Sequence, residues 1–218
     1  MDILKRNFIP SKIKEDYSKI AWIYDAWSLF TESKAAKKVL EFSGIKGKEN
    51  ILVVAIGTGT LFEKILSRNK NGYIYGIDIS PSMLEYAEAK LKNKNYNNYN
   101  LKEGNAYKLE FEDNHFHLLV NNYMLDLLPE EDFSRIIGEF YRVLKPGGKI
   151  IISSMATGNK WNNKLWFRIS KNFPGLMTNC RPVELKKYIL ECGFKNITSV
   201  YINQFTFPSE VIKAEKIN

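Results

Sequence analysis

The sequence is poor in residues that form disulfides or metal sites. It has two cysteines and two histidines among 218 residues, and no Cys/His spacing is typical of a zinc site, so we expect no metal. Cys180 and Cys192 flank a predicted helix that would hold them on the order of 16–18 Å apart, beyond the ~7 Å reach of a disulfide. We therefore expect free thiols in a reducing compartment.

Long apolar runs are also missing. None approaches the roughly 18–20 residues that cross a membrane, and the N-terminal stretch lacks the apolar segment of a secretory signal. A cytoplasmic location is the resulting expectation. The net charge of +8 is found in some proteins that bind nucleic acid or anionic membranes. The lysines are spread along the whole chain, however, which favours a solvated basic surface over a nucleic-acid interface.

The N-terminal part of the chain is predicted to be helical. Apolar and aromatic residues from Ile13 to Trp27 recur at spacings of three and four, which predicts an amphipathic helix. Thr31 is placed to cap a second helix that runs to about Ser43 and ends at Gly44. Because no repeat or Pro/Ser-rich linker divides the chain, residues 1–45 are interpreted as a helical cap on the domain formed by residues 46–218.

From Asn50 onward, predicted strands alternate with predicted helices, which indicates an α/β fold with a parallel sheet covered on both faces. Only two residues separate the last two predicted strands, too few for a crossover, so these strands must pair antiparallel. The predicted strands span 51–56, 73–79, 99–103, 116–121, 149–154, 197–202 and 205–214. The predicted helices between them span 59–68, 130–144 and 182–191, with a further one that starts at Ser80-Pro81.

A glycine turn, Gly57-Thr58-Gly59, joins the first buried strand to the next helix. Glycine is needed where the backbone turns sharply and a ligand lies against it. A dinucleotide-binding turn would have another glycine in place of Phe62, and the Gly-Lys-Ser/Thr ending of a phosphate-binding loop is also missing. The turn is therefore not built for a pyrophosphate. Asp78, at the end of the next strand, is placed to accept hydrogen bonds from both ribose hydroxyls of an adenosine.

Four segments match, in order, the motifs of class I SAM-dependent (S-adenosylmethionine-dependent) methyltransferases, which the chain resembles from about Tyr17 to Ser154. They are VVAIGTGTL, YGIDISPSMLEYAEAKL, EGNAYKLEFEDNHFHLLVNNYMLDLLP and EFYRVLKPGGKIIISS. The first helix, YSKIAWIYDAW, is further similar to that of the ubiquinone/menaquinone-biosynthesis type. The resemblance implies a Rossmann-like, mostly parallel seven-stranded sheet, with SAM as cofactor and a small-molecule or lipid-like methyl acceptor.

The resemblance also implies which residues bind the cofactor. Asp78 would bind the ribose hydroxyls, Asn105 would meet the adenine edge, and Asn121 would lie under the methionine end. Tyr17 and Tyr24 would close over the sulfonium, which an aromatic face attracts. The full set comprises Ala55, Gly57, Thr58, Gly59, Asp78, Ile79, Met83, Asn105, Ala106, Asn121, Tyr17 and Tyr24.

Two positions depart from the family's pattern. Members usually have an acidic residue near the cofactor's amino group where this chain has Val53, and many have Asp where it has Asn105. An amide oxygen can still bond adenine. An ammonium left poorly paired beside Val53 would cost about 1–3 kcal/mol of binding. A degenerate, non-catalytic SAM-binding protein is therefore one alternative that Val53 leaves open.

Methyl transfer requires alignment and exclusion of water, and often no dedicated catalytic residue. For an acceptor that must lose a proton, Asp126 is the candidate base and Tyr123 the candidate for orienting the acceptor. A helix-capping or surface aspartate explains Asp126 equally well.

The stretch 156–180 is long for a connection, which favours a lid. Its basic amphipathic helix would pack on the sheet or cover the site, and it also allows contact with a membrane surface. Nucleic-acid methylation is the second enzymatic alternative. It is disfavoured because Asn121-Asn122-Tyr123-Met124 is not the Asn/Asp-Pro-Pro-Tyr/Phe motif of many base-amino methyltransferases. The oligomeric state and the identity of the acceptor are not indicated by the sequence.

Overall fold

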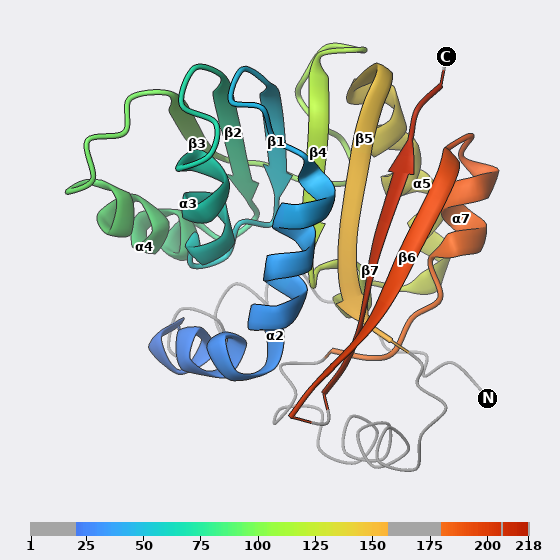
Figure 1. Ribbon diagram of the computed structural model, residues 1–218, viewed down its shortest axis with the longest axis horizontal. Coiled ribbons are helices and arrows are strands. Elements are labelled where there is room, and N and C mark those ends of the chain that lie inside the picture. Colours follow the sequence, from blue (N-terminus) through green and yellow to red (C-terminus); the bar gives the residue numbers. More distant parts are fainter. Residues whose placement is uncertain (1–20, 157–179, 206, 218) are drawn as a thin grey trace.

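The described part of the chain is built on a seven-stranded sheet with the order β3-β2-β1-β4-β5-β7-β6 (Figure 1). The structure is a computed structural model that describes residues 21–156, 180–205 and 207–217, with only the backbone for residues 21–31. The strands are β1 (Asn50–Val54), β2 (Tyr73–Asp78), β3 (Tyr99–Glu103), β4 (Phe116–Asn122), β5 (Leu144–Met155), β6 (Lys195–Gln204) and β7 (Phe207–Glu215).

The first five strands pair in parallel, whereas β7 lies between β5 and β6 and runs antiparallel to both. Ile152 of β5 lies opposite Ile212 of β7, and Val211 of β7 lies opposite Val200 of β6. The expected Rossmann-like sheet, mostly parallel with a C-terminal antiparallel hairpin, is confirmed.

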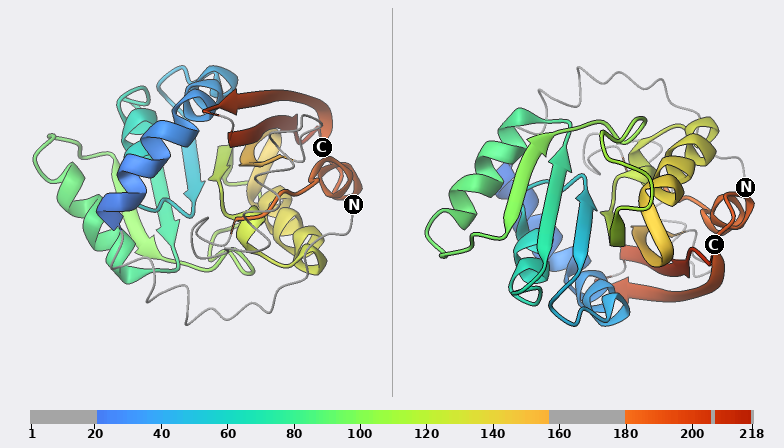
Figure 2. Two further views of the ribbon diagram at one scale, coloured as in Figure 1. Left: turned by 90° about the horizontal axis from the view of Figure 1, so that it is seen from below. Right: turned by 90° about the horizontal axis from the view of Figure 1, so that it is seen from above.

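Helices cover both faces of this sheet (Figure 2). The described helices are α2 (Ala21–Ser43), α3 (Thr60–Leu66), α4 (Pro81–Leu91), α5 (Phe133–Val143) and α7 (Lys186–Glu191), with short 3-10 turns η1 (Leu125–Leu127) and η2 (Glu130–Asp132).

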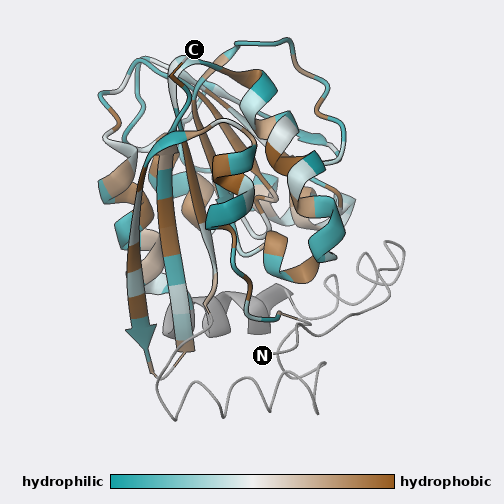
Figure 3. Ribbon diagram, turned by 90° about the vertical axis from the view of Figure 1, so that its right-hand side faces the viewer, coloured by the Kyte–Doolittle hydropathy of each residue, from teal (hydrophilic) through white to brown (hydrophobic). Residues whose placement is uncertain are grey.

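Strand β1 explains why the sheet is covered on both faces. Ile51 and Val53 pack in the core on the side of α2, α3 and α4, while Leu52 and Val54 pack with α5 and α7. Successive side chains of a strand point to opposite faces, so a strand that is apolar at every position needs cover on both. Figure 3 shows the α5 and α7 side, where helices with both hydrophilic and hydrophobic residues lie beside strands with long hydrophobic stretches.

The expected break between two N-terminal helices is wrong, because α2 continues through Thr31 without interruption. A hydroxyl cap is worth about 1 kcal/mol, and the sequence around it, with its Ala, Leu, Glu and Lys residues, favours a continuous helix. The end at Gly44 is confirmed, since this glycine adopts a left-handed φ of 56°.

Two further boundaries differ from expectation. Helix α7 begins at Lys186 rather than near Pro182, and the expected turn Lys145–Gly148 lies within the bounds of β5. Gly147 there has a φ of 76°, which shows the sharp local change of direction that the sequence suggested.

Candidate active site

The candidate site lies where the order of the parallel strands reverses, between β1 and β4. In open α/β sheets, ligands bind in the crevice beyond the carboxyl ends of the strands at such a switch point. A pocket opens there. The described residues that line it are Val54, Ala55, Gly57, Asp78, Ile79, Ser80, Met83, Gly104, Asn105, Ala106, Tyr107, Asn122, Tyr123, Met124, Leu127 and Leu128.

The glycine turn after β1 has three residues in the left-handed region: Ala55 at φ 59°, Gly57 at 53° and Gly59 at 78°. A Cβ added to Gly57 would meet no atom within 4 Å, whereas one added to Gly59 would lie 2.9 Å from Cβ of Ala87 on α4. Gly57 therefore keeps space open beside the pocket, and Gly59 allows the turn to approach α4.

Asp78 joins the turn to the end of β2. Its Oδ2 accepts the Gly57 N–H at 2.9 Å, and its Oδ1 accepts the Ser80 N–H at 2.9 Å. Burial raises the pKa of Asp78, and the hydrogen bonds from Ser80, Gly57 and Ile79 oppose that rise. A carboxylate has about four acceptor positions, so at least one remains for a hydroxyl group of a ligand in the pocket.

The pocket wall beyond Asp78 is largely apolar. Ile79, Met83 and Ala106 line it, and the last two are buried; their contact with adenine stays a prediction. Asn105 is exposed, and its side-chain oxygen accepts the backbone N–H of Tyr107 at 3.0 Å. The second lone pair of that oxygen is still available to a ligand, so its expected contact with adenine stays a prediction.

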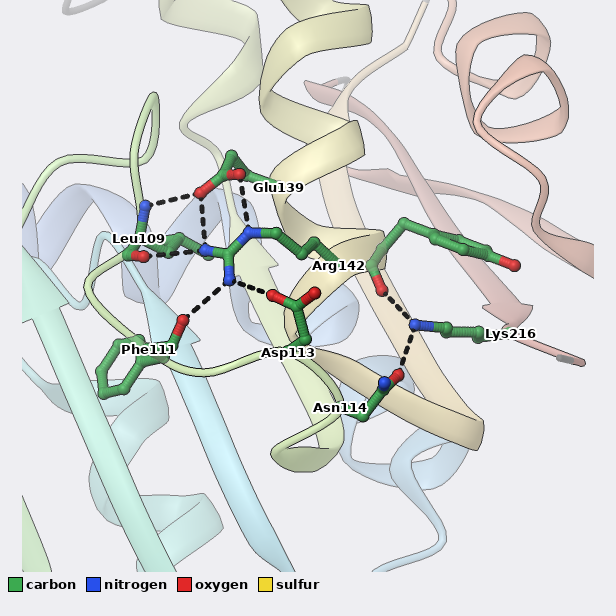
Figure 4. Close-up of polar contacts among 8 residues, drawn as sticks. Leu109, Phe111, Asp113, Asn114, Glu139, Arg142 and Lys216 are labelled. Atoms are coloured by element: carbon green, nitrogen blue, oxygen red, sulfur yellow. Dashed lines mark hydrogen bonds and ion pairs between the residues drawn. The ribbon is translucent and has the colours of Figure 1, made fainter.

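Arg142 of α5 forms hydrogen bonds with residues 109–113, which follow this wall in the sequence (Figure 4). Its guanidinium donates to the backbone oxygens of Leu109 and Phe111, each at 2.8 Å, and to the Asp113 carboxylate at 2.7 Å. Glu139 accepts two further bonds from Arg142 and one from the Leu109 N–H. All five donors of the guanidinium are thus directed at one loop and one neighbouring carboxylate.

At the end of β4, the expected residue Asn121 and its neighbour Asn122 lie in different surroundings. Asn121 is fully buried and donates to the Val54 carbonyl at 3.1 Å, and it lines neither of the two pockets described here. Asn122 lines both and accepts a hydrogen bond from Ser153. Sequence reasoning missed Asn122; the signal available was the alternation of strand faces, which assigns adjacent residues to opposite sides.

The two catalytic candidates are both buried. Asp126 is 0% exposed, does not line the pocket, and accepts the Met155 N–H at 3.2 Å. Burial raises the pKa of Asp126 to about 7. Tyr123 lines the pocket with a φ of 48°, and its hydroxyl bonds the Ser209 hydroxyl at 2.5 Å. Their roles toward an acceptor stay predictions.

A second pocket adjoins the first across the turn and shares Ala55, Gly57 and Asn122 with it. The expected cofactor residue Thr58 lines this second pocket, as does the apolar Val53. Glu32 of α2 also lines it, although no sequence signal linked this residue to the site.

Several expectations fall outside the described residues. Tyr17 lies in the undescribed N-terminal segment, and only the backbone of Tyr24 is described. Most of the proposed lid, residues 157–179, is also outside them. Within the described ranges, no helix is long and apolar enough to cross a membrane, and no three His, Cys, Asp or Glu side chains gather as metal ligands would. Cys180 and Cys192 are reduced cysteines that form no disulfide with each other, as expected.

Comparison with known proteins is consistent with this geometry. Residues 51–148 match a methyltransferase domain family. A demethylmenaquinone methyltransferase from Lactococcus lactis is 34% identical over 149 residues, which cover 66% of this chain and 55% of that protein. The corresponding enzyme of Lactobacillus johnsonii is 27% identical over 90% of this chain and 91% of its own length.

A solved SAM-dependent methyltransferase from Aquifex aeolicus shares the fold, with a TM-score of 0.65 and 19% identity over 96% of this chain and 100% of that one. The alignment with the Lactococcus protein spans little more than half of that relative's length. These matches assign residues 51–148 to a methyltransferase domain, and the described sheet has the fold of SAM-dependent methyltransferases.

Proposed function

We propose that the protein transfers a methyl group from SAM to a small-molecule or lipid-like acceptor. The observation that carries the proposal is the position of Asp78. Its carboxylate is held by the N–H groups of Gly57 and Ser80 and also lines the pocket beside the open glycine turn. A carboxylate with unused acceptor positions next to a backbone without side chains suits a ribose that lies against the turn.

The residues present fit an adenosine ligand. Ile79, Met83 and Ala106 offer an apolar wall for the base, and Gly57 leaves the backbone accessible on the other side. SAM supplies an electrophilic methyl group on a sulfonium. The contribution of the chain is to hold that group in line with the acceptor and to exclude water, which is the main requirement of a displacement with a good leaving group.

The acceptor side of the pocket favours an apolar molecule. Met124, Leu127 and Leu128, which follow β4, line the pocket beyond the turn. Buried apolar walls with few polar groups are typical of sites for apolar ligands. This supports a lipid-like acceptor, in keeping with the demethylmenaquinone for which the two bacterial relatives are named. The reduced state of Cys180 and Cys192 supports the cytoplasm as the compartment.

No dedicated base is part of the proposal. Asp126 is fully buried and does not line the pocket, and the Tyr123 hydroxyl is bonded to Ser209, so an acceptor that must lose a proton relies on its own acidity. The predicted roles of these two residues are tested separately, by the effect of Asp126→Asn and Tyr123→Phe on kcat.

Isothermal titration calorimetry with SAM, followed by an assay with radiolabelled SAM and demethylmenaquinone, tests the proposal. We expect SAM to bind and labelled methyl to appear in the quinone fraction. Absence of both heat and thermal stabilisation at millimolar SAM would contradict the assigned cofactor. Binding without a labelled product from demethylmenaquinone or from lipid extracts would instead support the non-catalytic SAM-binding alternative.

A further inference from the structure

Glu32 is a buried acidic residue beside the glycine turn that the proposed function has not yet used. It comes from α2, far from the turn in sequence, and its side chain is 8% exposed. It lines the second pocket together with Val53, Gly57 and Thr58. That pocket adjoins the one that contains Asp78. The turn therefore has one carboxylate on each side, Asp78 in the first pocket and Glu32 in the second.

The position of Glu32 is fixed by the C-terminal hairpin. The side-chain amide of Gln204, at the end of β6, accepts the Lys34 N–H at 2.7 Å and donates to the Ser33 hydroxyl at 2.8 Å. These two residues directly follow Glu32 on α2. Because Gln204 is itself buried, the helix is held over the sheet at this point. The carboxylate is thus part of a fixed wall of the pocket.

The charge environment of Glu32 favours a cation. Burial and the negative charge of Asp126 raise the pKa of Glu32 to about 8, and Tyr123 also lies close enough to feel its charge. In the described part of the chain, no basic side chain forms an ion pair with Glu32. Lys64 of α3, the one basic residue among those that line this pocket, is exposed. A ligand cation placed here would favour the ionised form of Glu32, which would then release its proton.

We propose that Glu32 binds the α-ammonium group of SAM, with the second pocket as the site for the cofactor's amino-acid end. The proposal rests on the function proposed above. An adenosine bound at Asp78 would direct its amino-acid end along the turn, where Val53 offers no charge and Glu32 is the carboxylate available. Lys64 provides a charge of the opposite sign in the same pocket, and an amino-acid group carries both signs.

The test compares two ligands that differ only at the amino-acid end. S-adenosylhomocysteine has the ammonium, whereas 5′-methylthioadenosine has the same adenosine and thioether without it. Glu32→Gln keeps the shape and removes the charge. Hydrogen bonds to charged groups contribute about 1.5–3 kcal/mol. We therefore expect the variant to bind S-adenosylhomocysteine at least about 10-fold more weakly in calorimetry, with unchanged affinity for 5′-methylthioadenosine.

Glu41→Gln is the matched control, because Glu41 lies on the same helix and is exposed, with Lys38 as its ion-pair partner. It should leave both affinities unchanged. A second readout is proton release: in buffers of different ionisation enthalpy near neutral pH, the wild type should release a proton on binding S-adenosylhomocysteine, and Glu32→Gln should not.

Each outcome separates this inference from the proposed function. If the wild type binds neither SAM nor S-adenosylhomocysteine, both fail. If the wild type binds them and Glu32→Gln binds S-adenosylhomocysteine equally well, only the role of Glu32 is overturned. Equal weakening of both ligands would show that Glu32 supports the fold rather than the ammonium, and would also overturn the inference.

Discussion

The carboxylate of Asp78 accepts the backbone N–H of Gly57 at 2.9 Å. This one bond joins the end of β2 to the turn after β1. Asp78, the residue proposed to bind the ribose, therefore also shapes the glycine turn. Substitution of Asp78 should consequently affect binding and stability together, which distinguishes it from a residue that only touches the ligand.

Asp78→Asn should weaken SAM binding at least about 10-fold and lower the free energy of unfolding by ~1–3 kcal/mol. An amide has only one acceptor oxygen, so either Gly57 or Ser80 loses the acceptor of its N–H. Calorimetry and urea unfolding measure the two effects. Glu85→Gln, on the exposed side of α4, is the control, and an unchanged SAM affinity in Asp78→Asn would show that the ribose lies elsewhere.

The two glycines of the turn should respond differently to alanine. Gly57→Ala should cost ~1–2 kcal/mol of stability from its left-handed φ alone but should strongly weaken SAM binding, because the methyl group would occupy open space beside the pocket. Gly59→Ala should be the less stable variant by a further ~1–3 kcal/mol, since its Cβ would lie 2.9 Å from Cβ of Ala87. Thermal unfolding and calorimetry on the two variants measure these effects. A Gly59→Ala variant more stable than Gly57→Ala would contradict the geometry.

Arg142→Lys should lower the free energy of unfolding by ~1–3 kcal/mol although the charge is kept. A lysine cannot reach the Leu109 and Phe111 carbonyls, Asp113 and Glu139 together, as the guanidinium does. Amide hydrogen exchange should increase in residues 105–113, next to the pocket wall. Arg68→Lys, at an exposed position, is the control, and unchanged exchange in Arg142→Lys would show that the loop is held by other contacts.

The ligand-free protein should lose stability as the pH rises from about 4.5 to about 8. The pKa of Glu32 is raised from 4.5 to about 8 in the folded protein, so over this window the folded state keeps a proton that the unfolded state releases. Stability from this group is complete below pH 4.5 and declines by up to ~1.4 kcal/mol per pH unit. Asp126, with its pKa raised to about 7, adds a decline of the same sign.

Glu32→Gln removes the first contribution and not the second. Its unfolding temperature should match that of the wild type near pH 4.5 and exceed it near pH 8.5. Differential scanning calorimetry across this range provides the comparison. Parallel curves for the two proteins would show that the folded state does not hold a proton on Glu32.

Much of the sheet could be predicted from local pattern. The apolar runs of β1, β4 and β5 have few alternatives to a buried strand, and the short connection before β7 requires an antiparallel pair. The prediction of a helix break at Thr31 was wrong because one capping residue contributes little against a surrounding sequence that favours a continuous helix.

The parts of the candidate site that come from one local segment could be predicted from the sequence. The parts formed where distant segments meet could not. The turn around Gly57 and the strand end at Asp78 are local features with known geometry. Glu32 reaches the turn only because α2 packs across the sheet, and nothing in its own sequence neighbourhood indicates this. Asn121 and Asn122 differ only in which face of β4 they occupy. The hydrogen bond that Asp126 accepts likewise comes from Met155, which is distant in sequence.

The bond between Gln204 and α2 has a consequence for the order of assembly during synthesis. Strand β7 fits between β5 and β6, and Gln204 immediately precedes the reversal into β7. The glycine turn and Asp78 emerge from the ribosome long before these strands, so the adenosine half of the pocket can form early. The wall that contains Glu32 is fixed only after the hairpin has been made. Recognition of the cofactor's amino-acid end therefore depends on the last strands to be synthesised.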